Sequence, residues 1–407
     1  MKHSIVISIG DELTSGRVCN SNAAFIARFI LKKGIINRKI IVIPDNKDEI
    51  INALQASDQY DFVFVTGGLG PTHDDITKKV VADYFNTKLV ENELLRAELE
   101  AFFKERNIEM SEINYEQALF PEKGEIVPND IGTAAGIHIK ENSTDYYFLP
   151  GVPAEMKLML EKYIGGKLEQ DERITRTRYA KIRTFGIAES RLYSRLQKWI
   201  AANGEVRVSF LPQMPGVDIF LESQKYSAID QAREFIDDNF AEYIFGYNDD
   251  SPYEILGKLL REQNLTIAVA ESCTGGLIGH SLTNRSGSST YFKGGIVAYS
   301  NQIKIEQLGV NKATIEQEGA VSRATAREMA AGVKKTFGVD LGISTTGIAG
   351  PTGGTKEKPV GTLWFGLAGA ETKTFKFSFN KNRITNKKAF AKFALIRTIQ
   401  YLNRRTL

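Results

Sequence analysis

The chain has 407 residues, too long for a single hydrophobic core, so we expect two or three domains. Charged residues make up 25%, but the net charge is only +3, which implies no overall field for nucleic acid or a membrane. No apolar run approaches the ~20 residues that span a bilayer. Two distant cysteines, Cys19 and Cys273, exclude a disulfide framework, and four histidines without metal-binding spacing argue against a dedicated zinc site.

The first residues contain a short apolar run that could imitate a signal sequence. Residues 1–10 lead directly into acidic Asp11 and Glu12 rather than into a small-residue cleavage site. We therefore interpret them as a first strand and expect a cytoplasmic protein without membrane segments.

Residues 1 to about 165 alternate strand and helix patterns, which predicts a doubly wound α/β domain with a parallel sheet. The expected strands are 5–9, 39–43, 62–65 and 146–149. The expected helices are 22–33, 47–56, 75–85, a charged stretch at 91–106, and a helix opened by Pro153. Ligands in this architecture bind beyond the carboxyl ends of the strands.

A glycine-rich loop connects the buried strand at 62–65 to the next helix. It reads Thr66-Gly67-Gly68-Leu69-Gly70-Pro71-Thr72-His73-Asp74-Asp75. Its glycines let a phosphate approach the main chain, and the helix start adds free N–H groups. Asp74 and Asp75 would repel a phosphate unless a divalent cation lay between them, so the loop predicts metal plus phosphate. The alternative is an ordinary turn with Asp75 as the helix N-cap.

Three further segments are expected at the same strand ends. They are Gly10-Asp11-Glu12-Leu13-Thr14-Ser15-Gly16, then Asn129 with Gly132-Thr133-Ala134, and Pro150-Gly151-Val152-Pro153-Ala154-Glu155. Five carboxylates could together hold one hard cation against a diphosphate: Asp11, Glu12, Asp74, Asp75 and Glu155.

Residues from about 170 to 250 predict a small α+β module. A turn at 186–190 leads into a helix, followed by strands at 206–211 and 217–223 and a helix through 235. The module begins with a basic run: Arg173, Arg176, Arg178, Lys181 and Arg183. Neither interleaved aromatics nor a Gly-x-x-Gly clamp accompanies this run, so we expect a solvated face or a spacer rather than nucleic-acid binding.

A second α/β pattern begins at Ser251. It predicts helices at 252–263 and from about 386 to 403, and strands at 265–270, 295–299, 341–345, 362–368 and 373–379. Five segments stand out: Glu271-Ser272-Cys273-Thr274-Gly275-Gly276, Gly287-Ser288-Ser289-Thr290-Tyr291-Phe292, Ala298-Tyr299-Ser300-Asn301-Gln302-Ile303-Lys304, Thr345-Thr346-Gly347-Ile348-Ala349-Gly350-Pro351-Thr352-Gly353-Gly354, and Lys358-Pro359-Val360-Gly361-Thr362.

No histidine lies within these segments, so a Ser-His-Asp triad is not expected. A serine with a lysine base is available instead, if burial keeps the lysine neutral. Cys273 is an alternative nucleophile, although it also lacks a histidine partner. In a purely structural interpretation, Ser272 or Thr274 is a helix cap, Lys304 a solvated lysine and Tyr299 a core aromatic.

Together with Asn22 and residues 149–156, these segments resemble the CinA family over essentially the whole chain and in the family's order. The resemblance implies a molybdopterin-binding-like (MoaB/MogA-like) domain at 1–168, a small KH-like α+β module at 169–250, and a three-layer α/β domain at 251–407. Two positions depart from the family pattern: Thr14 stands where a hydrophobic residue is usual, and Ala135 where a proline is usual.

The same resemblance implies a bifunctional enzyme of pyridine-nucleotide salvage. Its first domain is expected to cleave ADP-ribose to AMP and ribose 5-phosphate with a divalent metal (Mg, Mn or Co) held by the five carboxylates. Substrate contacts would come from Gly67, Gly68, Gly70, Pro71, Thr72, Asn129, Gly132, Thr133 and Gly151. Its last domain is expected to convert nicotinamide mononucleotide into nicotinic acid mononucleotide and ammonia without a cofactor.

Roles in the last domain also follow from the resemblance. Ser289 would be the nucleophile, Lys304 its base and Tyr299 a hydroxyl relay. Ser272 would be a fourth catalytic residue, in contact near the amide. The remaining residues would bind substrate: Thr274 and Gly275, Thr346 and Gly347 holding the ribose phosphate from a helix start, and Arg383 as a phosphate anchor.

Two other interpretations stay open. One is a competence- or DNA-damage-associated binding protein whose middle module docks onto recombination machinery. The other is a first domain that binds a pterin and cleaves nothing. We also expect a homodimer, because such open α/β chains often pair by symmetry.

Overall fold

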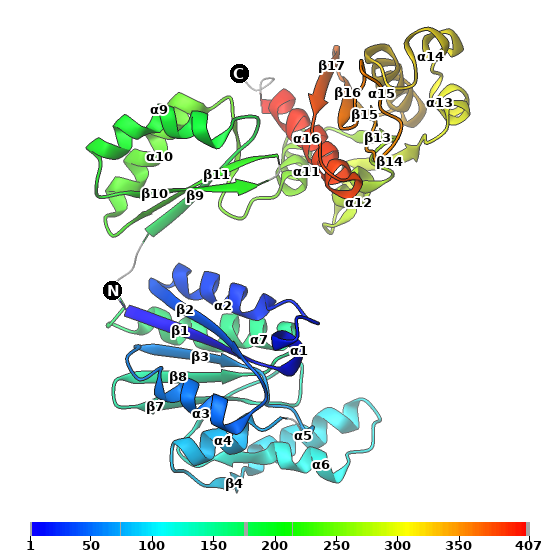
Figure 1. The fold of residues 1–407 in the computed structure, drawn as a ribbon. Helices are drawn as coiled ribbons and strands as arrows, with labels where there is room; N and C mark the ends of the chain where they lie inside the picture. Colours follow the sequence, from blue (N-terminus) through cyan, green and yellow to red (C-terminus); the bar gives the residue numbers. More distant parts are fainter. Residues whose placement is uncertain (1, 74, 175–177, 214, 404–407) are drawn as a thin grey trace. The chain divides into compact units, whose positions relative to one another are not determined.

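The computed structural model describes residues 2–73, 75–174, 178–213 and 215–403. The chain divides into two compact units, Met1–Arg178 and Tyr179–Leu407, which are described separately (Figure 1). Asp74 and Arg176, both singled out in the sequence, lie outside the described residues. The domain boundary expected near residue 250 falls inside the second unit, which contains two separate sheets.

The first unit is built on a six-stranded sheet with the order β2-β1-β3-β8-β7-β6. The strands β2 (Ile35–Ile43), β1 (Lys2–Ile9), β3 (Phe62–Thr66) and β8 (Thr144–Leu149) are parallel. One edge of the sheet departs from the expected parallel pattern, because β7 (Gly136–Glu141) and β6 (Glu125–Val127) run antiparallel. The reason is a tight β7–β8 hairpin, which can join only antiparallel strands.

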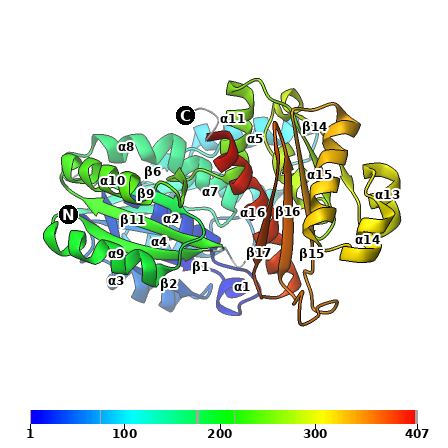
Figure 2. The ribbon, with the colours of Figure 1, turned by 90° about the horizontal axis from the view of Figure 1, so that it is seen from above.

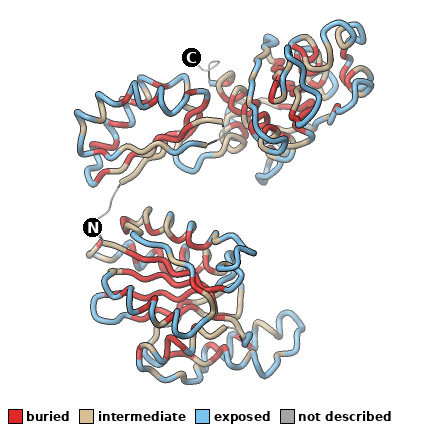
Figure 3. The backbone as a smooth tube through the Cα atoms, viewed as in Figure 1, coloured by how far each residue is buried: buried red, intermediate tan, exposed pale blue. Residues whose placement is uncertain are grey.

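Helices cover both faces of this sheet, and its strands are the most buried part of the unit (Figure 3). Val63 and Val65 of β3 pack into one core cluster, whereas Phe62 and Phe64 pack into the other, as the two-residue period of a strand requires. The helices are α1 (Asp11–Thr14), α2 (Ser21–Lys32), α3 (Lys47–Gln55), α4 (Thr77–Tyr84), α5 (Glu93–Glu105), α6 (Glu112–Tyr115), α7 (Pro153–Met159) and α8 (Gly165–Gln170). A π-helical turn, Leu160–Ile164, joins α7 to α8, and β4 (Leu89–Glu91) pairs with β5 (Leu119–Pro121).

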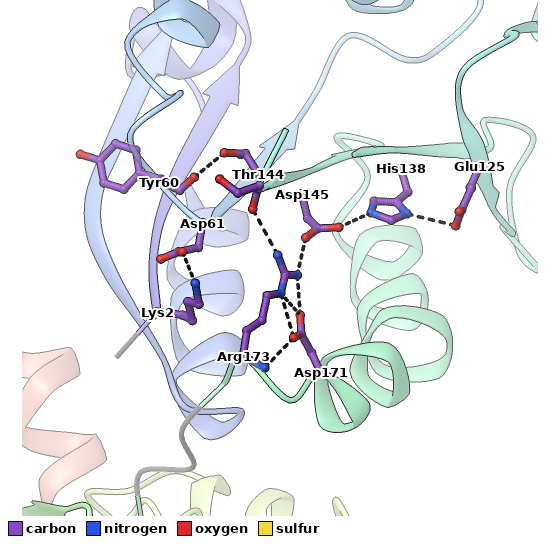
Figure 4. Close-up of polar contacts among 10 residues, drawn as sticks. Lys2, Tyr60, Asp61, Glu125, His138, Thr144, Asp145, Asp171 and Arg173 are labelled. Carbon is purple, nitrogen blue, oxygen red and sulfur yellow. Dashed lines mark hydrogen bonds and ion pairs between the residues drawn. The ribbon is translucent and has the colours of Figure 1, made fainter. Parts of the chain in front are cut away.

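A network of polar contacts ties the end of the first unit to its sheet (Figure 4). The Arg173 guanidinium donates to the carboxylates of Asp171 and Asp145. The other oxygen of Asp145 lies 2.8 Å from His138 Nε2, and His138 Nδ1 lies 3.1 Å from Glu125. Arg173, the first residue of the basic run, is therefore paired with carboxylates of its own unit.

The second unit begins with a four-stranded sheet of order β10-β11-β9-β12. Its elements are β9 (Arg178–Thr184), α9 (Glu189–Ala202), β10 (Arg207–Gln213), β11 (Gly216–Ser223), α10 (Tyr226–Phe240) and β12 (Ile244–Tyr247). Its core contains residues of both helices and of the sheet. Lys181 pairs with Asp249 and Arg183 with Asp218, so these two cations of the basic run are also engaged internally.

The rest of the second unit is a three-layer α/β fold with the sheet order β14-β13-β15-β16-β17. The strands β14 (Phe292–Val297), β13 (Ile267–Glu271) and β15 (Leu341–Gly347) are parallel, whereas β16 (Thr362–Ala368) and β17 (Thr372–Ser378) are antiparallel.

Figure 2 shows α16 and α15 on opposite sides of this sheet. On one face lie α11 (Pro252–Glu262), α12 (Leu277–Thr283) and α16 (Arg383–Asn403), which pack around the larger core cluster. On the other lie α13 (Asn301–Leu308) and α15 (Arg323–Phe337), with α14 (Lys312–Glu318) beside α15. Within the described part of the chain, no helix has the length and hydropathy needed to cross a bilayer.

Candidate functional sites

The glycine-rich loop of the first unit is folded tightly between β1 and α4. Gly67 and Gly68 have φ values of 115° and 68°, in the left-handed region that favours glycine. A Cβ on Gly67 would lie 2.1 Å from the Ile9 carbonyl oxygen, and one on Gly68 would lie 2.1 Å from Thr77 Oγ1. Both glycines are therefore required by the packing of the loop itself, whatever it binds.

Segments distant in sequence meet at this loop, as expected. Asn22 Nδ2 donates to Thr66 Oγ1 (3.0 Å) and to the Gly151 carbonyl (2.8 Å), and Thr66 Oγ1 donates to the Pro150 carbonyl (2.9 Å). A Cβ on Gly151 would lie 3.6 Å from the Gly67 Cα. The carboxyl ends of β3 and β8 therefore form one continuous edge lined by main chain.

The acidic side chains near this edge make local hydrogen bonds. Asp75 accepts from the Thr72 N–H (3.0 Å) and from the Thr72 hydroxyl. Helix α4 begins only at Thr77, with Ile76 as its cap, so the alternative of Asp75 as N-cap is wrong. Glu155 accepts from Asn129 Nδ2 (2.7 Å). These bonds stabilise the loops that carry the expected binding residues.

The described residues do not form the expected metal site. Asp11 and Glu12 are exposed on α1, and the Asp11 N–H donates to Asp45 Oδ2 (3.0 Å). Among the residues that the structure describes, no three His, Cys, Asp or Glu side chains are placed to hold one ion. Because Asp74 lies outside these residues, metal binding stays a prediction.

A cavity of about 280 Å³ adjoins three of the expected substrate-binding residues: Asn129, Gly132 and Thr133. Its opposite wall includes Phe102 and Arg106 of the α5 region, with the guanidinium carbon 3.6 Å from the Phe102 ring centroid. Sequence reasoning missed this wall. The charged helical pattern at 91–106 identified the element but not the surface against which it packs.

In the second unit, the site lies at the carboxyl ends of β13, β14 and β15. The loop after β13 is shaped by Glu271, whose buried carboxylate accepts from the N–H groups of Gly276 (3.0 Å), Ile278 (3.1 Å) and Gly279 (2.8 Å). Ser272 and Thr274 do not cap α12; that task falls to Glu271. Thr274 is buried, with its hydroxyl 2.7 Å from that of Thr345.

Lys304 is the most unusual side chain of this site. It is only 2% exposed, and its Nζ donates to the Ala298 carbonyl at 2.8 Å. Burial lowers the pKa of Lys304 below its ordinary value. In the described part of the chain no carboxylate pairs with this ammonium group, and only main-chain carbonyls accept hydrogen bonds from it. Lys304 is therefore not a solvated lysine and is suited to act as a base.

Cys273 lies in the same loop, and its surroundings disfavour a role as the nucleophile. The side chain is buried, and burial raises the pKa of the thiol to about 12. The attacking form of a cysteine is the thiolate, which is scarce at neutral pH when the pKa is raised.

Cationic groups from the start of α16 face this loop. Arg383 donates to the Tyr299 hydroxyl (2.7 Å) and to the Gly350 carbonyl (2.6 Å). Tyr299 is 62% exposed, so it is not a core aromatic. A Cβ on Gly275 would lie 3.3 Å from Lys387 Nζ, which places a second cation at the loop. Sequence reasoning missed Lys387, although its spacing of four residues from Arg383 puts both on one helix face.

The expected role of Thr346 and Gly347 needs correction. These residues end β15 and are followed by a loop and β16, so no helix starts there. The Thr346 hydroxyl donates to the Ala320 carbonyl (2.6 Å) and holds the segment before α15. The helix start that faces the site is that of α16.

Ser289, the expected nucleophile, lies far from Lys304 within one chain. It belongs to the one-turn helix η3 (Ser288–Thr290) directly before β14. Phe292 at the start of β14 pairs with Ile267, whereas Val297 pairs with Glu271 at the site. Because six strand residues span roughly 17–20 Å, Ser289 and Lys304 lie beyond opposite ends of β14.

Comparisons with known proteins cover both units. Residues 249–402 match the CinA C-terminal domain, and residues 5–170 match a probable molybdopterin binding domain. A CinA-like protein of Cytophaga hutchinsonii is 40% identical over 371 residues, covering 89% of each chain, and one of Salinibacter ruber is 37% identical over 399 residues, covering 96% of this chain and 97% of its own. A solved CinA of Thermoplasma acidophilum is 31% identical and covers 41% of this chain and 98% of its own, with a TM-score of 0.38.

Proposed function

The chain belongs to the CinA family, with a molybdopterin-binding-like first domain, and from that premise we propose that its last domain is an amidohydrolase acting on nicotinamide mononucleotide. The observation that carries the proposal is Lys304, a buried lysine without a carboxylate partner among the described residues, beside a loop that contains Ser272. Such a lysine can take a proton from a serine hydroxyl without a histidine as the base.

Charge and position favour a nucleotide over a free amide. Arg383 and Lys387 stand one helical turn apart at the beginning of the 21-residue helix α16. Their two cations and the helix start together suit a phosphate group. The phosphate would therefore bind at α16, leaving the other end of the substrate near Lys304.

The proposed reaction has two steps. The serine oxygen bonds to the amide carbonyl carbon while its proton moves to Lys304 Nζ. The carbon–nitrogen bond then breaks, the proton passes to the leaving nitrogen, and ammonia departs. Water next attacks the ester with Lys304 as base, which releases the acid and restores the serine.

The test is ammonia release from nicotinamide mononucleotide by the whole protein. The rate should rise with pH through an apparent pKa below the 10.5 of an ordinary lysine, because only neutral Lys304 accepts the proton. Lys304→Met should lower the rate by about 10²–10⁴-fold.

Lys312→Met, at an exposed lysine of α14, is the matched control and should leave the rate unchanged. Absence of ammonia with the unmodified protein would contradict the proposal and favour a binding role in competence or DNA repair.

For the first domain, we propose hydrolysis of the diphosphate of ADP-ribose. The cavity beside Asn129, Gly132 and Thr133 supports this, because Arg106 adds a cation and Phe102 an aromatic face suited to a nucleotide. The proposed metal would need Asp74 in addition to the described carboxylates.

Production of AMP from ADP-ribose, with and without divalent cations, tests this second activity. Asp75→Asn should abolish it by releasing the loop at Thr72, while ammonia release stays intact. Asp83→Asn, at an exposed aspartate of α4, is the control. Binding of ADP-ribose without cleavage would instead favour a non-hydrolytic, pterin-like binding domain.

A further inference from the structure

A buried asparagine fixes the first turn of α16. Asn386 lies between Arg383 and Lys387 in this turn, and its side chain is 0% exposed. Its Nδ2 donates to the main-chain carbonyls of Ala349 (2.9 Å) and Lys381 (2.8 Å), and its Oδ1 accepts from the Lys381 N–H (3.0 Å). One side chain therefore joins the start of the helix to two other segments of the main chain.

These three bonds require an amide rather than any side chain of the same size. An asparagine side chain offers both N–H donors and a carbonyl acceptor. Leucine has nearly the same shape but cannot form hydrogen bonds, so it would leave buried N–H and C=O groups unpaired. Asn386 therefore contributes through its hydrogen bonds and not only by filling space.

The segment that Asn386 holds is the base of the loop after β15. The Ile348 N–H donates to the Thr362 carbonyl (2.8 Å), and the Gly361 N–H donates to the Ile348 carbonyl (2.7 Å), so the two ends of the loop are closed against each other. The Phe379 N–H also donates to the Gly361 carbonyl (3.0 Å) and links this base to the chain that leads into α16. Residues 348–350 and 361–362, which stood out in the sequence, thus form a fixed support for the helix start.

The two cations of α16 depend on the same support. Arg383 Nη1 donates to the Gly350 carbonyl, the neighbour of the Ala349 carbonyl that Asn386 holds. Lys387 directly follows Asn386 and faces the β13 loop at Gly275. Any shift of the first turn of α16 would therefore displace both cations together.

We infer that Asn386 is a positioning residue, which sets the first turn of α16 against the loop after β15 and thereby holds Arg383 and Lys387 where the phosphate of the substrate binds. The inference rests on the proposed amidohydrolase function and identifies what orients its phosphate-binding cations. Asn386 acts through these cations and not by contact with substrate, since its side chain is fully buried and bonded to main chain.

The test is the preference of full-length Asn386→Leu for a phosphorylated substrate. Its kcat/KM for nicotinamide mononucleotide should fall about tenfold relative to its kcat/KM for nicotinamide riboside, because the riboside has no phosphate for misplaced cations to lose. A merely structural role would reduce the amount of folded protein and lower both rates alike. An unchanged ratio would overturn the inference.

Thr398→Val is the matched control. Thr398 is also a fully buried polar residue of α16, and its hydroxyl donates to the Ala394 carbonyl (2.8 Å). It lies about four turns beyond Arg383, so its loss should leave the ratio unchanged. If Asn386→Leu does not fold, Asn386→Ser disturbs the packing less and should lower the ratio in the same direction.

A combined variant separates positioning from direct contact. Arg383→Gln with Lys387→Met removes both cations, so adding Asn386→Leu should not lower the ratio further, because no cation remains to be displaced. A further fall would show that Asn386 acts by another route and would overturn the inference.

A final measurement does not depend on catalysis. Calorimetric binding of nicotinamide mononucleotide to Lys304→Met protein should weaken about tenfold when Asn386→Leu is added. If the unmodified protein released no ammonia but binding still weakened, the amidohydrolase proposal would be refuted and the positioning role retained. Equal binding with and without Asn386→Leu would refute the positioning role and leave the amidohydrolase proposal intact.

Discussion

At the scale of single residues, burial distinguishes Lys304 from the other lysines near it in the sequence. Lys304 and Lys312 lie on consecutive helices and are indistinguishable by local sequence pattern, yet one is 2% exposed and the other lies on the surface. The sequence motif 298–304 identified Lys304 only through the family resemblance. Its pKa depends on the packing of α13 and the β13 loop, which local sequence does not describe.

Lys387 gives a prediction at this scale. Lys387→Met should raise the KM for nicotinamide mononucleotide about tenfold with little change in kcat, because its cation would bind the phosphate rather than the reacting amide. Steady-state kinetics with the nucleotide and with phosphate-free nicotinamide riboside provide the measurement.

Lys388→Met is the control, since Lys388 is exposed on the adjacent position of α16. An equal effect of Lys387→Met on the riboside would show that Lys387 does not bind the phosphate.

At the scale of elements, the loop between β13 and α12 depends on one carboxylate. Glu271 is 1% exposed and accepts three N–H groups at the start of α12. The sequence suggested Ser272 or Thr274 as the cap, because these residue types favour that position. Glu271, the last residue of the preceding strand, instead accepts the free N–H groups of the helix start. Sequence patterns for helix caps do not predict this, because the fold brings Glu271 to the helix.

Glu271→Gln should therefore lower the free energy of unfolding of the second unit by about 1–3 kcal/mol, because an amide cannot accept all three bonds equally well. Urea unfolding followed by tryptophan fluorescence measures this directly, since both tryptophans, Trp199 and Trp364, belong to this unit.

Glu262→Gln is the control. Glu262 is an exposed residue of α11 in a surface ion pair with Lys258. Loss of this ion pair should lower the free energy of unfolding by less than about 1 kcal/mol. If the two variants unfolded at the same urea concentration, the cap assigned to Glu271 would be wrong.

At the scale of the whole molecule, the order of the segments and both α/β patterns follow from the sequence. The parallel strands β1, β3 and β13 were foreseen, because buried parallel strands read as continuous apolar runs. The antiparallel strands β6 and β7 were not, since hairpin formation at one edge leaves the apolar pattern unchanged.

The polar network at Arg173 predicts how the first unit responds to acid. Burial would raise the pKa of Asp145, but hydrogen bonds from His138 and Arg173 hold it below its ordinary value, and Arg173 also lowers the pKa of Asp171. A carboxylate with a lowered pKa in the folded state stabilises the fold at pH values above the unfolded pKa, near 3.8. That contribution is lost as the pH falls through the folded pKa.

Arg173→Met should therefore destabilise the first unit more at pH 7 than at pH 3. Hydrogen exchange of the β8 amides, expressed as opening free energies at both pH values, is the measurement. Arg96→Met, which removes exposed ion pairs to Glu91 and Glu100, should have a small effect at both. If Arg173→Met lowered the opening free energies equally at both pH values, the role assigned to the carboxylates of Asp145 and Asp171 would be contradicted.

The sequence by itself determined the family, the α/β patterns and the segments that carry chemistry, because these depend on periodicity and on short strings of residues. Only the tertiary structure decided that Asp75 and Glu155 are engaged within their loops, that Lys304 is buried, that Lys387 faces the β13 loop, and that Ser289 and Lys304 lie beyond opposite ends of β14. The physical reason is that burial, charge pairing and the ends of strands are set by contacts between residues distant in sequence.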